Sequence, residues 1–178
     1  MAITLNGSAG VTTNSGAVYD SIQRGTAQAT TSGTSIDFTG IPNWVKRITV
    51  MFNGVSTSGT STPLIQIGSS SVTTSGYVSG SSGAAVSGAN LTNGTTSTTG
   101  FVIFGTLASD LIYGTMIITN ISGNIWVSSH ATYVATGQQV CSNGAGSITL
   151  SGTLDRVRIT TTNGTDTFDA GSINILYE

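Results

Sequence analysis

Short runs of alternating apolar and polar residues recur along this chain, and they constrain its fold more than any other feature. Such alternation, with many β-branched residues, is typical of half-buried β-strands. The clearest runs are Arg47–Phe52, Leu64–Ile67, Phe101–Leu107, Leu111–Thr119, Ile125–Val134, Ser147–Leu150, Leu154–Thr161 and Ser172–Tyr177, and weaker ones are Gly25–Thr30 and Ser35–Phe38. Asn-Gly, the dipeptide that favours tight hairpin turns, begins at Asn6, Asn53, Asn93, Asn143 and Asn163. The pattern predicts an all-β, antiparallel β-sandwich of jelly-roll type.

Helical signals are nearly absent from the sequence. No window keeps an apolar i, i+3, i+4 pattern, and the strong helix formers Glu and Lys occur once each. Thr, Ser and Gly make up nearly half of the chain, while charged residues account for 7%. Pro occurs only twice and Ile and Val recur in clusters, so the composition indicates a folded chain solvated by hydroxyl groups rather than a disordered one.

Composition divides the chain into an arm and a body. Residues 1–20 hold one short strand-like piece and little apolar content, so we expect an N-terminal arm or docking segment. Residues 21–178 form the predicted sandwich. Within it, residues 68–99 are almost wholly Ser, Thr, Gly, Ala and Asn, with Tyr77 and Val78 as anchors. We expect a surface excursion here, built of low-propensity strands or ordered only against a neighbouring subunit. Because the apolar core looks small for this length, we expect a homotrimer.

Charge and hydropathy argue against several function classes. The net charge is −2, and no basic cluster is available to neutralise phosphates, so nucleic-acid binding is not expected. No apolar run approaches the roughly 18 residues of a membrane span, so no membrane insertion is expected. The N-terminus lacks the basic and apolar regions of a signal peptide. Cys141 is the single cysteine, which excludes an intrachain disulfide.

Few residues could carry catalysis or hold a metal. His130 is the only histidine and no Gly-x-Ser-x-Gly motif accompanies it, so we interpret it as structural. Cys141 has no nearby histidine to activate it. Asp166 and Asp169 could offer two carboxylates to Ca²⁺, but their spacing does not match a Ca²⁺ loop, and a capped turn is the preferred interpretation. We therefore expect no enzymatic activity, no cofactor and no metal site.

Four of the five cations stand in two predicted strands or directly beside them. Alternation places Arg47, Arg156 and Arg158 opposite the apolar face of their strands, where a partly buried cation needs a partner. We expect structural ion pairs among Lys46, Arg47, Arg156, Arg158, Asp166 and Asp169, with Asp37 and Glu178 as further acids. An anion-binding patch is the alternative. The two large aromatic residues, Trp44 and Trp126, are candidate receptor or interface aromatics, since an exposed indole can stack on a saccharide.

Several segments of the chain resemble a domain that recurs in tailed bacteriophages, at the C-terminal end of tail-fibre-like virion proteins. The segments are "FTGIPNWVKRITVMFNGVSTSGTS", "QIG", "TSGYVS" and "LSGTLDRVRITTTNGTDTFDAGSINILYE". The resemblance covers residues 24–178, is strong at both ends, and is weak around "SSGAAVSGANLTNGTT". The start, "MAITLNGSAGVTT", is similar to the beginning of small phage fibre proteins. The resemblance implies a homotrimeric β-sandwich without catalytic residues or cofactor.

These inferences predict a non-enzymatic structural protein of a tailed phage virion, namely a short tail fibre or fibre-like surface protein. It would be made in the host bacterial cytoplasm, and its arm would dock it on other tail or capsid proteins at the virion surface. One alternative is a capsid decoration (cement) or head-fibre protein that stabilises the shell. An alternative of another class is a carbohydrate-binding module that takes a host surface glycan.

Overall fold

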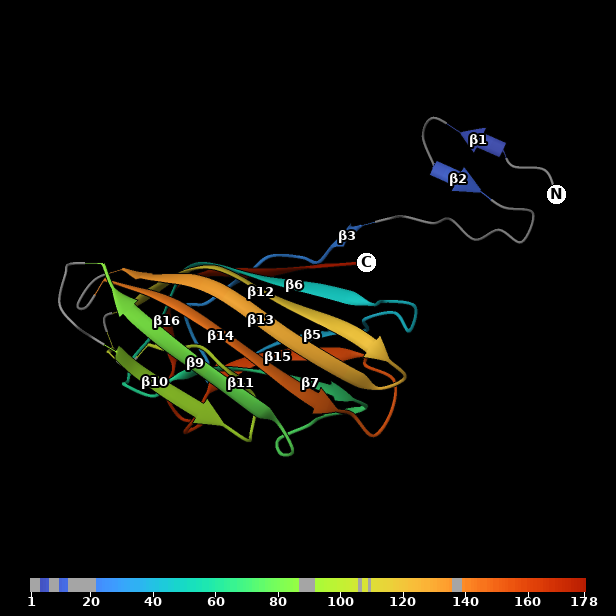
Figure 1. The fold of residues 1–178 in the computed structure, drawn as a ribbon. Helices are drawn as coiled ribbons and strands as arrows, with labels where there is room; N and C mark the ends of the chain where they lie inside the picture. The colour runs from blue at the N-terminus through green and yellow to red at the C-terminus, as the bar shows by residue number, and fades with distance from the viewer. Residues whose placement is uncertain are drawn as a thin grey trace.

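The computed structural model describes residues 4–6, 10–12, 22–86, 92–105, 107–108, 110–135 and 139–178. Within these ranges the chain is all-β, and two antiparallel sheets pack against each other as a sandwich (Figure 1). The all-β class and the antiparallel β-sandwich predicted from the alternating runs are therefore confirmed.

The larger sheet has nine strands in the order β10-β9-β14-β13-β12-β6-β16-β3, and β4 also pairs with β16. Its strands are β3 (Gln23–Arg24), β4 (Gln28–Ala29), β6 (Arg47–Thr57), β9 (Val78–Ala85), β10 (Thr92–Ser97), β12 (Leu111–Ser122), β13 (Ile125–Ala135), β14 (Val140–Thr149) and β16 (Phe168–Tyr177). Consecutive strands β12, β13 and β14 form a meander, and the chain's last strand lies beside β6.

The smaller sheet has five strands in the order β11-β7-β15-β5, with β8 paired to β7. Its strands are β5 (Ile36–Thr39), β7 (Pro63–Ser69), β8 (Ser71–Val72), β11 (Phe101–Val102) and β15 (Arg156–Thr161). Near the N-terminus, β1 (Thr4–Asn6) and β2 (Gly10–Thr12) pair with each other as a separate two-stranded sheet.

The core lies between the two sheets, and the predicted strand faces supply it. In β6, Ile48 and Val50 point inward with no exposed surface, while Arg47 on the opposite face is exposed. In β15, Val157 and Ile159 are fully buried, and the neighbouring arginines point outward. Because alternating side chains point to opposite faces, both strands present an apolar side to the core and a polar side to solvent.

Residues 68–99 form low-propensity strands, which was one of the two expected forms of this segment, but these strands belong to the larger sheet and not to a surface excursion. β9 and β10 are strands of the larger sheet, although their sequence is almost entirely Ser, Gly, Thr and Ala. Small residues are required in these strands because core side chains lie directly against their backbone. A Cβ atom on Gly83 would lie 2.3 Å from Cγ1 of Val140 and 2.6 Å from Cδ1 of Phe104. Tertiary packing thus overrides the low strand propensity of this segment.

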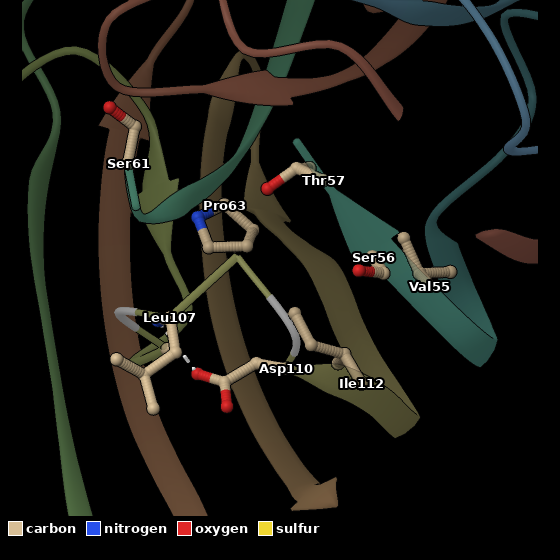
Figure 2. Close-up of a pocket in the computed structure, with 9 residues that line it drawn as sticks. Val55, Ser56, Thr57, Ser61, Pro63, Leu107, Asp110 and Ile112 are labelled. Carbon is tan, nitrogen blue, oxygen red and sulfur yellow. Dashed lines mark hydrogen bonds between the residues drawn. The ribbon is translucent and has the colours of Figure 1, made fainter. Parts of the chain in front are cut away.

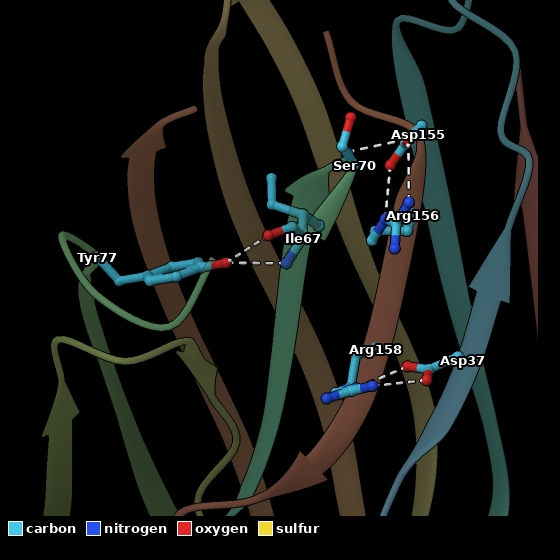
Figure 3. Close-up of polar contacts among 7 residues, drawn as sticks. All are labelled: Asp37, Ile67, Ser70, Tyr77, Asp155, Arg156 and Arg158. Carbon is cyan, nitrogen blue, oxygen red and sulfur yellow. Dashed lines mark hydrogen bonds and ion pairs between the residues drawn. The ribbon is translucent and has the colours of Figure 1, made fainter. Parts of the chain in front are cut away.

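Of the two predicted anchors in this segment, only Tyr77 serves as one. Its side chain is 1% exposed, and its ring meets Phe101 edge-on with centroids 5.0 Å apart. Its hydroxyl accepts a hydrogen bond from the Ile67 amide and donates one to the Ile67 carbonyl (Figure 3). Burial raises the pKa of Tyr77 to about 12, so the phenol stays protonated as this double contact requires. Val78 is 75% exposed, which contradicts its expected role.

The Asn-Gly dipeptides were expected to mark turns, and this is wrong for three of them. Asn53, Asn93 and Asn143 lie inside β6, β10 and β14. Only Asn163 belongs to a loop between two strands of the sandwich, where Gly164 adopts a φ of 67°. In β14 the glycine after Asn143 serves close packing, because a Cβ there would lie 2.5 Å from the Gly80 carbonyl oxygen.

Candidate functional site

The outer face of the smaller sheet carries an ion pair between strands. Arg158 of β15 lies directly opposite Asp37 of β5 in the strand register. Its Nε and Nη2 each donate to one carboxylate oxygen of Asp37 at 2.7 Å (Figure 3). The hydrogen bond to Asp37 raises the pKa of Arg158 further above its usual value. The pair is bidentate, which is the strongest geometry for this contact, and Asp37 was one of the candidate partners.

Arg156, two residues earlier, takes a partner that sequence analysis did not propose. Its Nε lies 2.7 Å from Oδ1 of the neighbouring Asp155. By strict alternation Asp155 would share the core-facing side of Val157 and Ile159. Because β15 begins at Arg156, the period of two does not extend to Asp155. The Asp155 carboxylate also accepts the Ser70 amide at 3.0 Å, and its pKa is lowered, chiefly by the Arg156 hydrogen bond.

The cations at the start of β6 meet the end of the chain. Arg47 forms an ion pair with the Glu178 side chain. The Lys46 and Arg47 amides both donate to the Glu178 carbonyl, at 2.7 and 2.8 Å. In the described part of the chain the Lys46 side chain is exposed and has no ion pair.

The two acids after β15 do not serve the arginines, which corrects the expected pairing. Asp166 accepts hydrogen bonds from the Asn163 side-chain amide at 2.7 Å and from the Ser61 backbone amide at 2.9 Å. These contacts, the Asn163 bond first, lower the pKa of Asp166. They build the capped turn that was the preferred interpretation of this segment. Asp169 is exposed, and no ion pair with another described residue involves it.

His130 lies in a buried polar network below the larger sheet. Its Nε2 is 3.1 Å from the Ser81 hydroxyl of β9 and 3.4 Å from the Ser142 hydroxyl of β14. Ser81 also accepts the Phe104 amide at 3.0 Å. Burial lowers the pKa of His130 from 6.5 to about 4, so the imidazole is neutral.

A serine next to a histidine is also the arrangement of an activated nucleophile. Here the hydroxyls of Ser81 and Ser142 are already engaged with each other at 3.0 Å, and their residues are 5% and 0% exposed. The network therefore satisfies polar groups inside the sandwich, as buried polar groups require.

Asp110 lines a small cavity between the two sheets, beside β6, β7 and β12 (Figure 2). The cavity has a volume of about 10 Å³, and its walls include Val55, Pro63 and Ile112. The Asp110 carboxylate accepts the Leu107 amide at 2.9 Å and so caps its own turn. A space of this size accommodates about one water molecule and no substrate. In the described residues, no three His, Cys, Asp or Glu side chains gather where they could hold a metal ion.

The two tryptophans have different environments. Trp126 is 3% exposed and belongs to the core, so it is not available to a receptor or to another subunit. Trp44 is 44% exposed, and its ring tilts against Tyr177 with centroids 6.1 Å apart. Of the two, only Trp44 could stack on a ligand.

The outer face of the larger sheet was missed by the sequence analysis. Strands β10, β9, β14, β13 and β12 lie side by side and contain no Lys, Arg, Asp or Glu. The sequence does contain a signal for this uncharged surface, because Asp110 is the only charged residue between Arg47 and Asp155, the stretch that supplies these strands. Most of the exposed large apolar residues stand on this face: Val78, Tyr113, Ile117, Ile121, Ile125 and Tyr133.

Comparison with known proteins identifies no relative of this chain. No protein-family model, curated protein sequence or solved structure matches the chain. In the described part of the molecule, no helix has the length and apolar character needed to cross a membrane.

Proposed function

We propose that this chain is a non-enzymatic structural protein of a tailed bacteriophage virion, a short tail fibre or fibre-like protein on the virion surface. The observation that carries the proposal is the N-terminal hairpin. Strands β1 and β2 pair with each other and belong to neither sheet of the sandwich. A body that closes its core without this hairpin leaves it available to bind another protein by strand pairing.

The layout of arm and body supports attachment to a particle. Residues 1–20 would bind tail or capsid proteins, and the sandwich would project from the surface as a homotrimer. The resemblance of residues 24–178 to tail-fibre-type domains supports the same assignment. A hydroxyl-rich exterior with few charges suits a protein displayed outside the cell, after synthesis in the bacterial cytoplasm.

The test is deletion of residues 1–20 in the phage. The truncated chain should keep the far-ultraviolet circular dichroism and the melting temperature of the sandwich, but it should be missing from purified particles on immunoblots. A variant with residues 2–20 scrambled controls for length and composition and should also be missing. Normal incorporation of either variant would contradict the docking role. Location of the intact chain in a cryo-EM map then decides between a tail fibre and a capsid decoration or head-fibre protein.

The exposure of Trp44 favours a second candidate function, the binding of a host surface glycan. A half-exposed indole held in place by Tyr177 offers a rigid apolar surface on which a sugar ring can stack. Trp44→Ala should then abolish binding of the purified protein to host cells, while Trp44→Phe, which keeps an aromatic ring, should retain part of it. Equal binding by wild type and Trp44→Ala would exclude this function.

A further inference from the structure

The outer surface of strands β10, β9, β14, β13 and β12 is named here the uncharged face. The register brings its outward residues into rows across the strands: Tyr113 lies opposite Tyr133, and Tyr133 lies opposite Cys141. Further along, Ile117 lies opposite Ser129, which lies opposite Ala145. The rows combine apolar and small neutral side chains, so the whole surface lacks a charged group.

The two sides of β13 show how unusual this face is for a solvent-exposed surface. Its inward residues, Trp126, Ser128, His130, Thr132 and Val134, fill the core. Its outward residues are Ile125, Val127, Ser129, Ala131 and Tyr133, which are at least as apolar and include neither a charge nor a side-chain amide. Strands with one solvated face normally alternate between apolar and polar residues, whereas strands buried on both faces do not. The sequence of β13 is therefore that of a strand covered on both sides.

The uncharged face has the size of a stable protein interface. Its five strands have between 6 and 12 residues each. At a strand spacing of about 4.8 Å and a rise of about 3.3 Å per residue, they cover roughly 700 Å². A standard interface buries about 800 Å² on each partner. Apolar side chains as exposed as Val78 at 75% and Ile121 at 62% would gain free energy from being covered.

We propose that the uncharged face binds the same face on further copies of this chain. A surface without charges offers no complementary field to a charged partner, whereas it matches an equally neutral surface. Each copy carries one such face, and symmetric self-association repeats every favourable contact. The ion pairs of the described residues lie elsewhere, on the smaller sheet and between Arg47 and Glu178. The small residues Ala131, Ala145 and Gly80 let two backbones approach closely.

Cys141 provides an independent probe of this contact. It is an exposed free thiol on β14, in the row that contains Tyr133 and Ala84. If the uncharged faces meet, the thiol becomes inaccessible to alkylating reagents in the assembled protein. It returns to solvent when the copies separate.

The first experiment measures the mass of the full chain by sedimentation and light scattering at micromolar concentration. Wild type should have a multiple of the 18.0 kDa chain mass. Ile117→Glu and Ala145→Glu each place a carboxylate on the uncharged face at an outward position, and each should reduce the mass to that of one chain. Thr39→Glu adds the same charge on the exposed side of the smaller sheet and should leave the assembly intact. Unchanged circular dichroism shows that the variants are folded.

The second experiment follows alkylation of Cys141 by a maleimide reagent in the native protein. The thiol should react at least tenfold more slowly in wild type and Thr39→Glu than in Ile117→Glu. Two results would overturn the proposal: a wild-type monomer with a freely reactive thiol, or an oligomer that survives both glutamate variants with Cys141 still reactive.

Self-association through the uncharged face follows from the composition and geometry of the sheet and not from a location in a virion. The experiments use the purified chain alone. If the purified chain is a monomer, self-association through the uncharged face is contradicted, and the arm deletion still tests docking on the particle. If the chain lacking residues 1–20 is incorporated normally, the docking role is contradicted, and the self-association is unaffected.

Discussion

The outer face of the smaller sheet carries paired charges, whereas the outer face of the larger sheet, from β10 to β12, carries none. In the smaller sheet the apolar residues point inward and Arg158 points outward to Asp37. In the larger sheet, His130, Ser81 and Ser142 point inward, while Ile117 and Tyr133 point outward. A strand's polar residues therefore do not by themselves identify its solvent side. Where both sides of a sheet are covered, polar groups can be paired within the core.

The largest expected loss of stability comes from disturbing the close packing on the core side of the larger sheet. Gly144→Ala should destabilise the protein by about 3 kcal/mol or more, because the new Cβ would lie 2.4 Å from Cε1 of His130 and 2.5 Å from the Gly80 carbonyl oxygen. The backbone oxygen cannot move without disturbing the β14–β9 pairing. Urea denaturation of both proteins measures the difference.

Gly123→Ala is the matched control for that substitution. Gly123 has a φ of 52° and no heavy atom within 4 Å of an added Cβ. It should therefore lose only about 1–2 kcal/mol, the cost of a left-handed backbone for alanine. Equal losses at the two positions would mean that the polar network below the larger sheet is loosely packed.

The next expected effect is a dependence of stability on pH. It distinguishes the buried His130, whose ordinary pKa is 6.5, from the surface ion pairs, whose carboxylates titrate at lower pH. The pKa of His130 is lowered from 6.5 to about 4 in the folded protein. The unfolded chain therefore takes up a proton near pH 6.5 while the folded chain does not, so stability is complete above pH 6.5 and falls towards pH 4. The loss is up to about 3 kcal/mol. Urea midpoints measured from pH 7.5 to 4.5 check it.

His130→Gln removes the titrating group and should flatten this part of the profile, whatever its effect on stability at pH 7.5. The carboxylates of Asp155 and Asp166 also have lowered pKa values, but from an ordinary value of 3.8. Their contribution is therefore lost at more acidic pH than that of His130. A profile with the same slope in wild type and His130→Gln would show that His130 is not the group responsible.

The smallest expected effect concerns the ion pair on the smaller sheet. Arg158→Ala should lower stability by about 1 kcal/mol or less, because both side chains remain about one third exposed to solvent and salt. The effect should shrink at high salt. A double-mutant cycle with Asp37→Asn isolates the pair. If Arg158→Ala instead keeps full stability and assembly but loses attachment to host cells, the arginine belongs to a receptor site.

Some of the structure could be predicted from local sequence. The alternation at Arg47–Phe52 and Ile125–Val134 located the centres of β6 and β13, because side-chain direction in a strand depends only on position along it. The same rule put Arg156 and Arg158 on the outer face of β15. The turn after Asn163 was also predictable, since its hydrogen bonds join residues close in sequence.

Other features depended on contacts between distant residues. Local patterns along the chain are sufficient to predict the all-β class and the faces of the strongly alternating strands. Residues 78–85 and 92–97, by contrast, become strands through long-range packing, since their small side chains are favourable when neighbouring strands and the core close over them. Long-range packing also pairs Arg158 with Asp37, 121 residues away, and places His130 between two serines from other strands. Strand register is a property of the assembled sheet, because each strand offers many similar pairings and packing of the core selects one of them.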